Sequence, residues 1–427
     1  MTTYLRKLGL FSGTMAVVGG IIGGGIFRTP ATVAERLDSP RAVLVAWVIG
    51  GLIALIGAFV WGELGQRRPR AGGGYVYLRE TFGPLPAFLY GWTLVLVIAT
   101  GAIAAVAVTF ADYTLALGGL PHRYSMPLAI AAIVLLSGIN YVGVKPAAIT
   151  QNIFTVLKLT ALAVLIGAGL FVAVPTPPST ALSPPSTAFG AALVPILFTY
   201  GGWQQTNFIA EEIIEPERNL PRALVLGVAI VVTVYLLTNY VYLHVLGVDG
   251  LGASTAPAAD TMSRLLGPVG GKVIAAGIAI STFGFLNLVI LVTPRVLQAM
   301  AADGVFFQRF AVLHPRYHTP STAILALAVC AVILTLSGTF GQMVDYVTFG
   351  DWIFFGLTAA SLFVYRRGTS DPAPTFRVPG YPYTVLLFVA AAAFVVFSSI
   401  ASNPRNAVIG AGLIALGIPA FLYWRRT

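Results

Sequence analysis

The first long apolar segment contains the stretch Gly19-Gly20-Ile21-Ile22-Gly23-Gly24-Gly25-Ile26-Phe27, in which five of the first seven residues are glycine. Each glycine inside a helix costs about 1 kcal/mol relative to alanine, so roughly 5 kcal/mol opposes a continuous helix here. In a bilayer, unwound backbone is tolerated only where it is buried in protein or lines a polar cavity. The stretch therefore predicts an interrupted membrane helix whose free N–H and C=O groups hold a ligand.

A helix–helix packing motif is the alternative interpretation of the same glycines. Both Gly19/Gly23 and Gly20/Gly24 fit the G-x-x-x-G spacing of close helix contacts. That motif needs glycine on one face only, whereas three consecutive glycines remove side chains from every face. We favour the interruption, because broken helices of membrane transporters have this composition.

The composition indicates an integral membrane protein. The chain has 427 residues, of which 57% are hydrophobic and 9% charged, and its mean hydropathy is +0.86. Soluble domains carry about 25% charged residues. Apolar runs long enough to cross a bilayer as helices recur along the whole length. The alternating ten-residue pattern of a membrane β-barrel is not found in the sequence.

The net charge of +10 does not indicate a nucleic-acid-binding protein. Most Lys and Arg residues fall in loops on one side of the predicted spans, which is the positive-inside asymmetry. We therefore expect a multi-pass protein of the cell membrane, with both termini in the cytoplasm and its first helix retained. The single Cys330 excludes disulfide frameworks and cysteine metal clusters, and we expect no metal and no cofactor.

We predict an all-α protein with twelve transmembrane helices. The spans are placed at about 8–36, 40–64, 84–118, 125–143, 146–174, 188–213, 222–247, 268–300, 319–337, 343–365, 380–400 and 405–424. Residues 1–365 would form the transport core, and residues 366–427 would form two accessory helices.

Two of these spans share the glycine interruption. The sixth contains Tyr200-Gly201-Gly202, and spans one and six each begin a block of five. The first starts in the cytoplasm and the sixth starts outside. This pattern predicts two five-helix repeats of inverted topology, about 1–174 and 188–365, as in the leucine-transporter-type fold. The broken helices would then face each other near the membrane midplane and form the binding site.

The two interruptions predict a site for a zwitterion. The free N–H groups at about Gly23–Ile26, at the start of a half-helix, suit a carboxylate. The carbonyls that end the preceding half-helix at Gly20–Ile22, and those at Phe198-Thr199-Tyr200, suit a cation. An α-amino acid carries both groups on one carbon.

The motifs around the interruptions also resemble a known family. Residues 19–27 look like the first-helix motif of the amino acid–polyamine–organocation superfamily. The string Phe198-Thr199-Tyr200-Gly201-Gly202-Trp203, followed by residues 211–222, closely resembles the sixth-helix motif of its L-type amino acid transporter branch. Similarity continues from Phe283-Gly284 through Asp303-Gly304 to Thr319-Pro320.

The resemblance implies sodium-independent amino acid transport by alternating access, often as obligatory exchange. It places the substrate carboxylate on the amides of Gly23, Gly24 and Gly25. It places the amine on carbonyls, namely those of Ile21, Phe198, Thr199 and Gly201. Two positions depart from the family pattern. Gly24 stands where relatives often have serine or threonine, and Gln204 stands where many have asparagine.

Lys158 is the second strong feature, because the chain has only four lysines and this one lies in the middle of a span. An in-span lysine costs about 2.5–3.5 kcal/mol to insert, and its depth disfavours the alternative that it reaches the interface. We predict that its ammonium bonds to carbonyls of the first interruption and to the hydroxyls of Ser281 or Thr282. It would there replace a sodium ion, a placement that the resemblance supports.

Other residues near the interruptions give weaker predictions. Arg28 and Asp351 could pair as an outer gate, although each could instead meet water or another neighbour. Phe198 and Trp203 are candidate walls of the pocket, on the ground of adjacency alone. His314 and His318 have a spacing seen in metal sites, but nearby prolines argue against a helix there.

The favoured function is secondary transport of neutral L-amino acids, by exchange or proton symport. A polyamine or cationic amino acid permease is the alternative within the same class, and an ion channel is the alternative of another class. An enzyme is disfavoured, because no catalytic cluster lies at one depth. The expected partners are an amino acid and the lipid bilayer, not nucleic acid, and the sequence does not indicate a partner subunit.

Overall fold

The computed structural model describes residues 3–172, 186–338, 340–368 and 374–426, and within them the chain is helical, with no strand. Helix bounds are α1 Leu10–Ile21, α2 Thr29–Arg36, α3 Pro40–Arg67, α4 Gly74–Phe82, α5 Pro84–Thr93, α6 Thr100–Gly118, α7 Ser125–Val142, α8 Val144–Phe171, α9 Ser186–Thr199, α10 Pro216–Gly252, α11 Pro257–Leu266, α12 Pro268–Ala302, α13 Ser321–Ser337, α14 Phe340–Gly368, α15 Tyr383–Ser402, α16 Pro404–Ala415 and α17 Gly417–Arg426.

Eight helical segments of this described part are long and apolar enough to cross a membrane. They are Pro40–Arg67, Pro84–Gly118, His122–Val142, Val144–Phe171, Pro216–Gly252, Pro268–Ala302, Tyr383–Ser402 and Pro404–Trp424. Helices α1 and α13 are apolar but shorter. The protein is therefore a multi-pass membrane protein, as the composition predicted.

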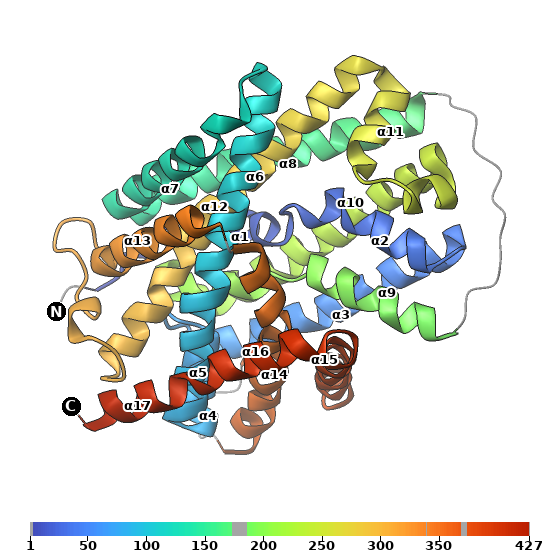
Figure 1. Cartoon of the computed structure of the whole chain (residues 1–427). Helices are drawn as coiled ribbons and strands as arrows, with labels where there is room; N and C mark the ends of the chain where they lie inside the picture. The colour runs from blue at the N-terminus through green and yellow to red at the C-terminus, as the bar shows by residue number, and fades with distance from the viewer. Residues whose placement is uncertain (1–2, 173–185, 339, 369–373, 427) are drawn as a thin grey trace.

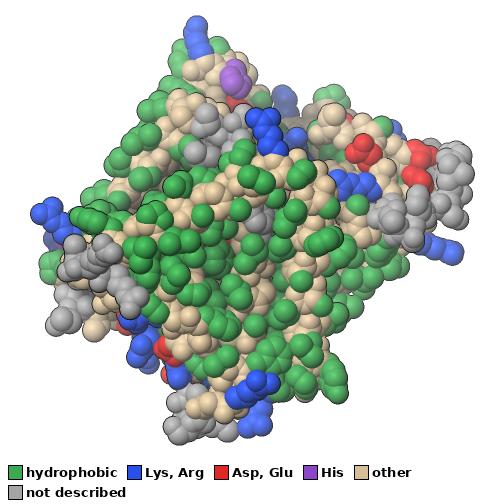
Figure 2. Space-filling model, turned by 60° about the horizontal axis from the view of Figure 1, so that its bottom comes forward, with side chains coloured by type: hydrophobic (Ala, Val, Ile, Leu, Met, Phe, Trp, Pro, Cys, Tyr) green, Lys and Arg blue, Asp and Glu red, His purple; other side chains and the backbone are tan. Residues whose placement is uncertain are grey.

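The surface agrees with this assignment. Figure 2 shows a broad face of hydrophobic side chains, with Lys and Arg side chains gathered toward its margins. Large apolar side chains are exposed on helix after helix, for example Leu135 on α7, Ile333 on α13 and Phe397 on α15. In water such a face would be unfavourable, whereas lipid tails cover it without cost.

Both predicted interruptions are present. The first helix stops at Ile21, and a short 3₁₀ turn at Gly25–Phe27 precedes α2. Helix α9 stops at Thr199, and after Gly202 the chain continues as a 3₁₀ segment, Trp203–Glu212. The composition of the two stretches was thus sufficient to locate both breaks.

Some element boundaries differ from those predicted. Helix α10 begins at Pro216, six residues before the predicted start, because proline is well suited to the first turn of a helix. The last predicted span, about 405–424, is divided into α16 and α17. The predicted span 84–118 has the correct limits, but a π-helical stretch, Leu94–Ala99, joins α5 to α6.

The N-terminal segment is fastened to the end of the second broken helix. Leu8 forms a parallel bridge with Ile213, in which the Ile214 amide donates to the Leu8 carbonyl at 2.8 Å. Close by, the guanidinium of Arg295 on α12 holds the carboxylate of Glu212 through two bonds of 3.1 and 3.0 Å, and both side chains are buried. Figure 1 shows both chain ends on this side of the molecule, away from α2, α9 and α11.

Candidate functional site

The two interrupted helices meet backbone to backbone. Gly202 has a φ of +116°, and a Cβ atom built on it would lie 2.1 Å from the carbonyl oxygen of Gly20. Only glycine fits this position, because any side chain would overlap the opposite backbone. The approach brings the amides and carbonyls of both breaks to one place at the centre of the helix bundle.

The first interruption offers free amides. The N–H groups of Gly24 and Gly25 have no hydrogen-bond partner among the described residues, whereas the Gly23 amide donates to the Ile21 carbonyl at 2.9 Å. Space beside Gly24 is open, since a Cβ atom there would meet nothing within 4 Å. Gly24 and Gly25 both line the cavity described below, with open space beside Gly24 and the Thr199 side chain packed close to Gly25, so free amides suited to an anionic group lie at the cavity edge.

Several carbonyls of the two interruptions already have donors. The hydroxyl of Tyr235 on α10 lies 3.1 Å from the Ile21 oxygen and 3.5 Å from the Thr199 oxygen. The Phe198 carbonyl accepts from the Gly201 amide at 3.0 Å. A carbonyl oxygen has two lone pairs, so each can accept one further donor from a ligand. With its single hydroxyl hydrogen Tyr235 can donate to one of these two carbonyls at a time, the nearer being that of Ile21, so its hydroxyl lies between the two breaks, a position that the sequence had not suggested.

Lys158 on α8 reaches the first interruption, as expected. Its side chain is fully buried, and its ammonium donates to the carbonyls of Ile22 at 2.6 Å and of Gly19 at 3.3 Å. The Ser281 hydroxyl on α12 lies 3.3 and 3.2 Å from the carbonyl oxygens of Ile22 and Gly23. Lys158 and Ser281 therefore share the Ile22 oxygen as an acceptor. The Thr282 hydroxyl instead turns back to Ile278 and Ala279 of its own helix.

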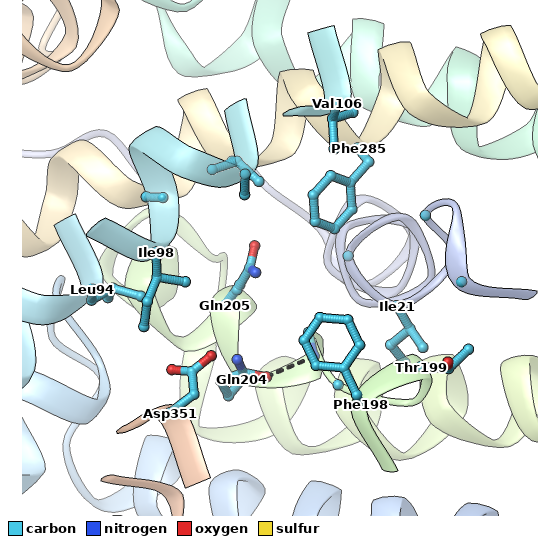
Figure 3. A pocket seen from close by; sticks show the side chains of 18 of the residues that line it. Ile21, Leu94, Ile98, Val106, Phe198, Thr199, Gln204, Gln205, Phe285 and Asp351 are labelled. Carbon is cyan, nitrogen blue, oxygen red and sulfur yellow. Dashed lines mark hydrogen bonds between the residues drawn. The ribbon is translucent and has the colours of Figure 1, made fainter. Parts of the chain in front are cut away.

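A cavity of about 310 Å³ opens between the interruptions, α6, α12 and α14. This volume lies at the lower end of the range for small-ligand pockets, about 300–1,000 Å³. The residues of the breaks that line it are Gly20, Ile21, Gly23, Gly24, Gly25, Phe198, Thr199, Gly201 and Gly202. Figure 3 shows Ile21 and Thr199 on one side of this space and Leu94, Ile98 and Asp351 on the other.

Two of the residues proposed for the substrate site do not line the cavity. The Ile22 side chain is fully buried, and the Ile22 carbonyl faces Lys158 and Ser281. Trp203 is also buried, with its ring centroid 6.3 Å from that of Trp61 and 6.0 Å from that of Phe355. Phe198, by contrast, is 51% exposed and lines the cavity, as Figure 3 also shows.

The structure does not bring Arg28 and Asp351 together. Arg28 has an exposed side chain, and no ion pair links it to Asp351 within the described ranges. Asp351 lies in the cavity wall. A gate from this pair requires a conformation other than the one described here, and it stays a prediction.

Nearly the whole chain matches one known protein family. Residues 8–423 match the amino acid permease family. The chain belongs to this family. The permease is 31% identical over 424 residues to the serine/threonine exchanger SteT of Bacillus subtilis, covering 97% of this chain and 96% of that protein. The resemblance stated from the sequence motifs is confirmed, and the permease is an amino acid transporter rather than an enzyme.

Mammalian relatives are equally similar. The permease is 32% identical to the human large neutral amino acids transporter small subunit 2, over 99% of this chain and 81% of that protein. It is also 32% identical to the human b(0,+)-type amino acid transporter 1, over 94% of this chain and 84% of that protein. These matches cover the broken helices, the cavity and the helices that follow.

Proposed function

We propose that this permease carries neutral L-amino acids across the cell membrane by alternating access, without sodium and by exchange. The observation that supports this function most strongly is the cavity between the two broken helices, which has the free amides of Gly24 and Gly25 at its edge. These amides would hold the substrate carboxylate. The carbonyls of Ile21, Phe198, Thr199 and Gly201 would accept the ammonium. The relatives named as an exchanger and as a large neutral amino acids transporter support the reaction and the substrate class.

The proposed independence from sodium rests on Lys158. Its ammonium stands at the carbonyls of Gly19 and Ile22, beside the Ser281 hydroxyl, where oxygen ligands converge. A fixed cation in this position neutralises the partial negative charge of those oxygens, as a bound metal cation would. The partial negative charge of these carbonyl oxygens would then be neutralised without a bound sodium ion.

The proposed architecture has two inverted repeats, about 1–174 and 188–365, and accessory helices in 366–427. Each repeat begins with a broken helix, and the two breaks meet at the cavity. Helices α15 and α16 pack on α14, and α17 packs on α5, outside this pair of repeats. The distribution of Lys and Arg supports cytoplasmic termini.

Uptake into proteoliposomes tests the proposal. With purified full-length protein, uptake of labelled L-leucine or L-serine is expected to saturate, and to accelerate when the vesicles contain unlabelled amino acid. Replacing sodium by choline should leave the rate unchanged. Uptake that requires sodium would contradict the role given to Lys158, whereas an unsaturable current would indicate a channel. Acceleration by an imposed pH gradient, without internal amino acid, would indicate proton symport in place of exchange.

A further inference from the structure

Gly19 is the glycine of the first interruption that does not line the cavity. A Cβ atom built on it would lie 1.9 Å from Nε2 of Gln151 and 2.8 Å from the hydroxyl oxygen of Thr155, both on α8. Both of these side chains are buried. Gly19 therefore makes room for two polar side chains to pack against α1 inside the helix bundle, where an unpaired polar group is costly.

These two side chains belong to a chain of hydrogen bonds that crosses four helices. Nδ2 of Asn140 on α7 donates to Oδ1 of Asn287 on α12 at 3.1 Å. Nδ2 of Asn287 donates to Oε1 of Gln151 at 3.0 Å, and Nε2 of Gln151 donates to the Thr155 hydroxyl at 3.1 Å. The Thr155 hydroxyl in turn donates to the Met15 carbonyl of α1 at 3.2 Å. All four side chains are buried.

Every bond of this chain is donated toward α1. Hydrogen bonds that run in one direction polarise one another, so the chain is stronger than its separate bonds. Inside a membrane protein little water is available to replace a lost partner, and removing one member leaves a buried donor or acceptor unsatisfied. The position of α1 is therefore coupled to that of α7 and α12 through the side chains of α8.

The chain ends one helical turn before a carbonyl that binds Lys158. Met15 precedes Gly19 by four residues in α1, and the Gly19 carbonyl accepts from the Lys158 ammonium at 3.3 Å. Nearer the start of α1, Nδ2 of Asn152 donates to the Ser12 hydroxyl at 3.0 Å. Helix α1 is thus held to α8 at three levels, and the middle one extends the attachment to α12 and α7, which pack on α8.

We propose that Gln151 and Thr155 are positioning residues for substrate binding, acting through this hydrogen-bond chain. The chain keeps α1 against α8 and so keeps the backbone of the first interruption at the cavity. When the chain is broken, α1 separates from α8 in a fraction of the molecules, and these do not hold substrate. The apparent affinity then falls with the fraction of the competent form, whereas saturating substrate restores that form and the maximal rate. The inference rests on the proposed function, because it assumes that the amino acid is held at the breaks.

Thr155→Val tests the inference, because valine has the shape of threonine without its hydroxyl. Exchange of labelled L-leucine by the full-length protein in proteoliposomes is measured over a range of concentrations. KM is expected to rise by about fivefold or more, while the maximal rate stays within about twofold of the wild type. Thr155→Ser, which keeps the hydroxyl, should restore most of the wild-type KM.

Gln151→Met cuts the same chain one bond earlier and should also raise KM. The double variant, Gln151→Met with Thr155→Val, should raise KM by less than the product of the two single effects, because both substitutions break one chain. A double variant described by that product would show that the two side chains act independently, and it would overturn the inference.

The matched control is Thr160→Val on the same helix, where the side chain is exposed and its hydroxyl donates to the Val156 carbonyl at 2.9 Å. Its KM should stay at the wild-type value. The inference is overturned if Thr155→Val has the same KM as Thr160→Val, or if its maximal rate falls without a rise in KM. Should Thr155→Val fail to fold, Gln151→Met decides by the same criteria. In each case leucine exchange by the wild type still supports the proposed function, and only its absence would refute that function.

Discussion

Replacing Gly202 by alanine is expected to abolish transport. The new Cβ atom would lie 2.1 Å from the Gly20 carbonyl oxygen, well inside the distance at which real Cβ atoms are found. The backbone at this position has a φ of +116°, which costs a residue other than glycine about 1–3 kcal/mol. Either the two broken helices separate or the peptide at Gly202 rotates, and both changes destroy the cavity wall. Leucine uptake should fall by about a hundredfold or more.

Gly138→Ala is the matched control for this substitution. Gly138 lies inside α7, and a Cβ atom added there would meet nothing within 4 Å. Alanine favours a helix by about 1 kcal/mol over glycine, so the variant should fold and transport like the wild type. Size-exclusion chromatography of both purified variants separates loss of fold from loss of transport. Wild-type uptake by Gly202→Ala would show that the close contact between the breaks is not required.

Replacing Lys158 by methionine should produce the second largest loss. Methionine keeps most of the length but leaves the Gly19 carbonyl without its side-chain donor and the Ile22 carbonyl with Ser281 alone. A hydrogen bond from a charged donor contributes about 1.5–3 kcal/mol, or roughly tenfold to a hundredfold in an equilibrium constant. Uptake measured well below saturation is expected to fall by at least about tenfold.

Lys145→Met provides the comparison, since Lys145 is an exposed lysine at the start of the same helix. It changes the net charge equally and should leave uptake near the wild-type rate. If Lys158→Met transported as well as Lys145→Met, the ammonium would have no role in holding the first interruption, and the account of sodium independence would be wrong.

The broken helices could be predicted because their cause is local. The five glycines from Gly19 to Gly25 disfavour a helix in any surroundings. An isolated lysine in an apolar span is stable only where its ammonium donates hydrogen bonds to buried oxygen atoms. The contact between Lys158 and the first interruption followed from these two facts, and it is present in the structure.

Other features depend on which face of a helix points inward. An apolar membrane helix shows little periodicity, because lipid and protein interior are equally apolar, so the inward orientation of Tyr235 could not be predicted. Trp203 follows the second break directly in sequence, yet the 3₁₀ segment that begins there turns its ring toward Trp61 on α3. Arg295 lies inside the predicted span 268–300, but nothing in the sequence indicated that it is buried in α12 with Glu212 as its partner.

Recognition of a zwitterion at the two breaks is the central claim, and competition by analogues of one substrate tests it most directly. Uptake of labelled L-leucine by the purified protein is measured against unlabelled L-leucine, isopentylamine, which lacks the carboxylate, and 4-methylpentanoate, which lacks the ammonium. The predicted result is strong inhibition by L-leucine and at least about hundredfold weaker inhibition by either analogue. Inhibition by isopentylamine as strong as that by L-leucine would contradict the claim, because the amides of Gly24 and Gly25 would then contribute nothing to binding.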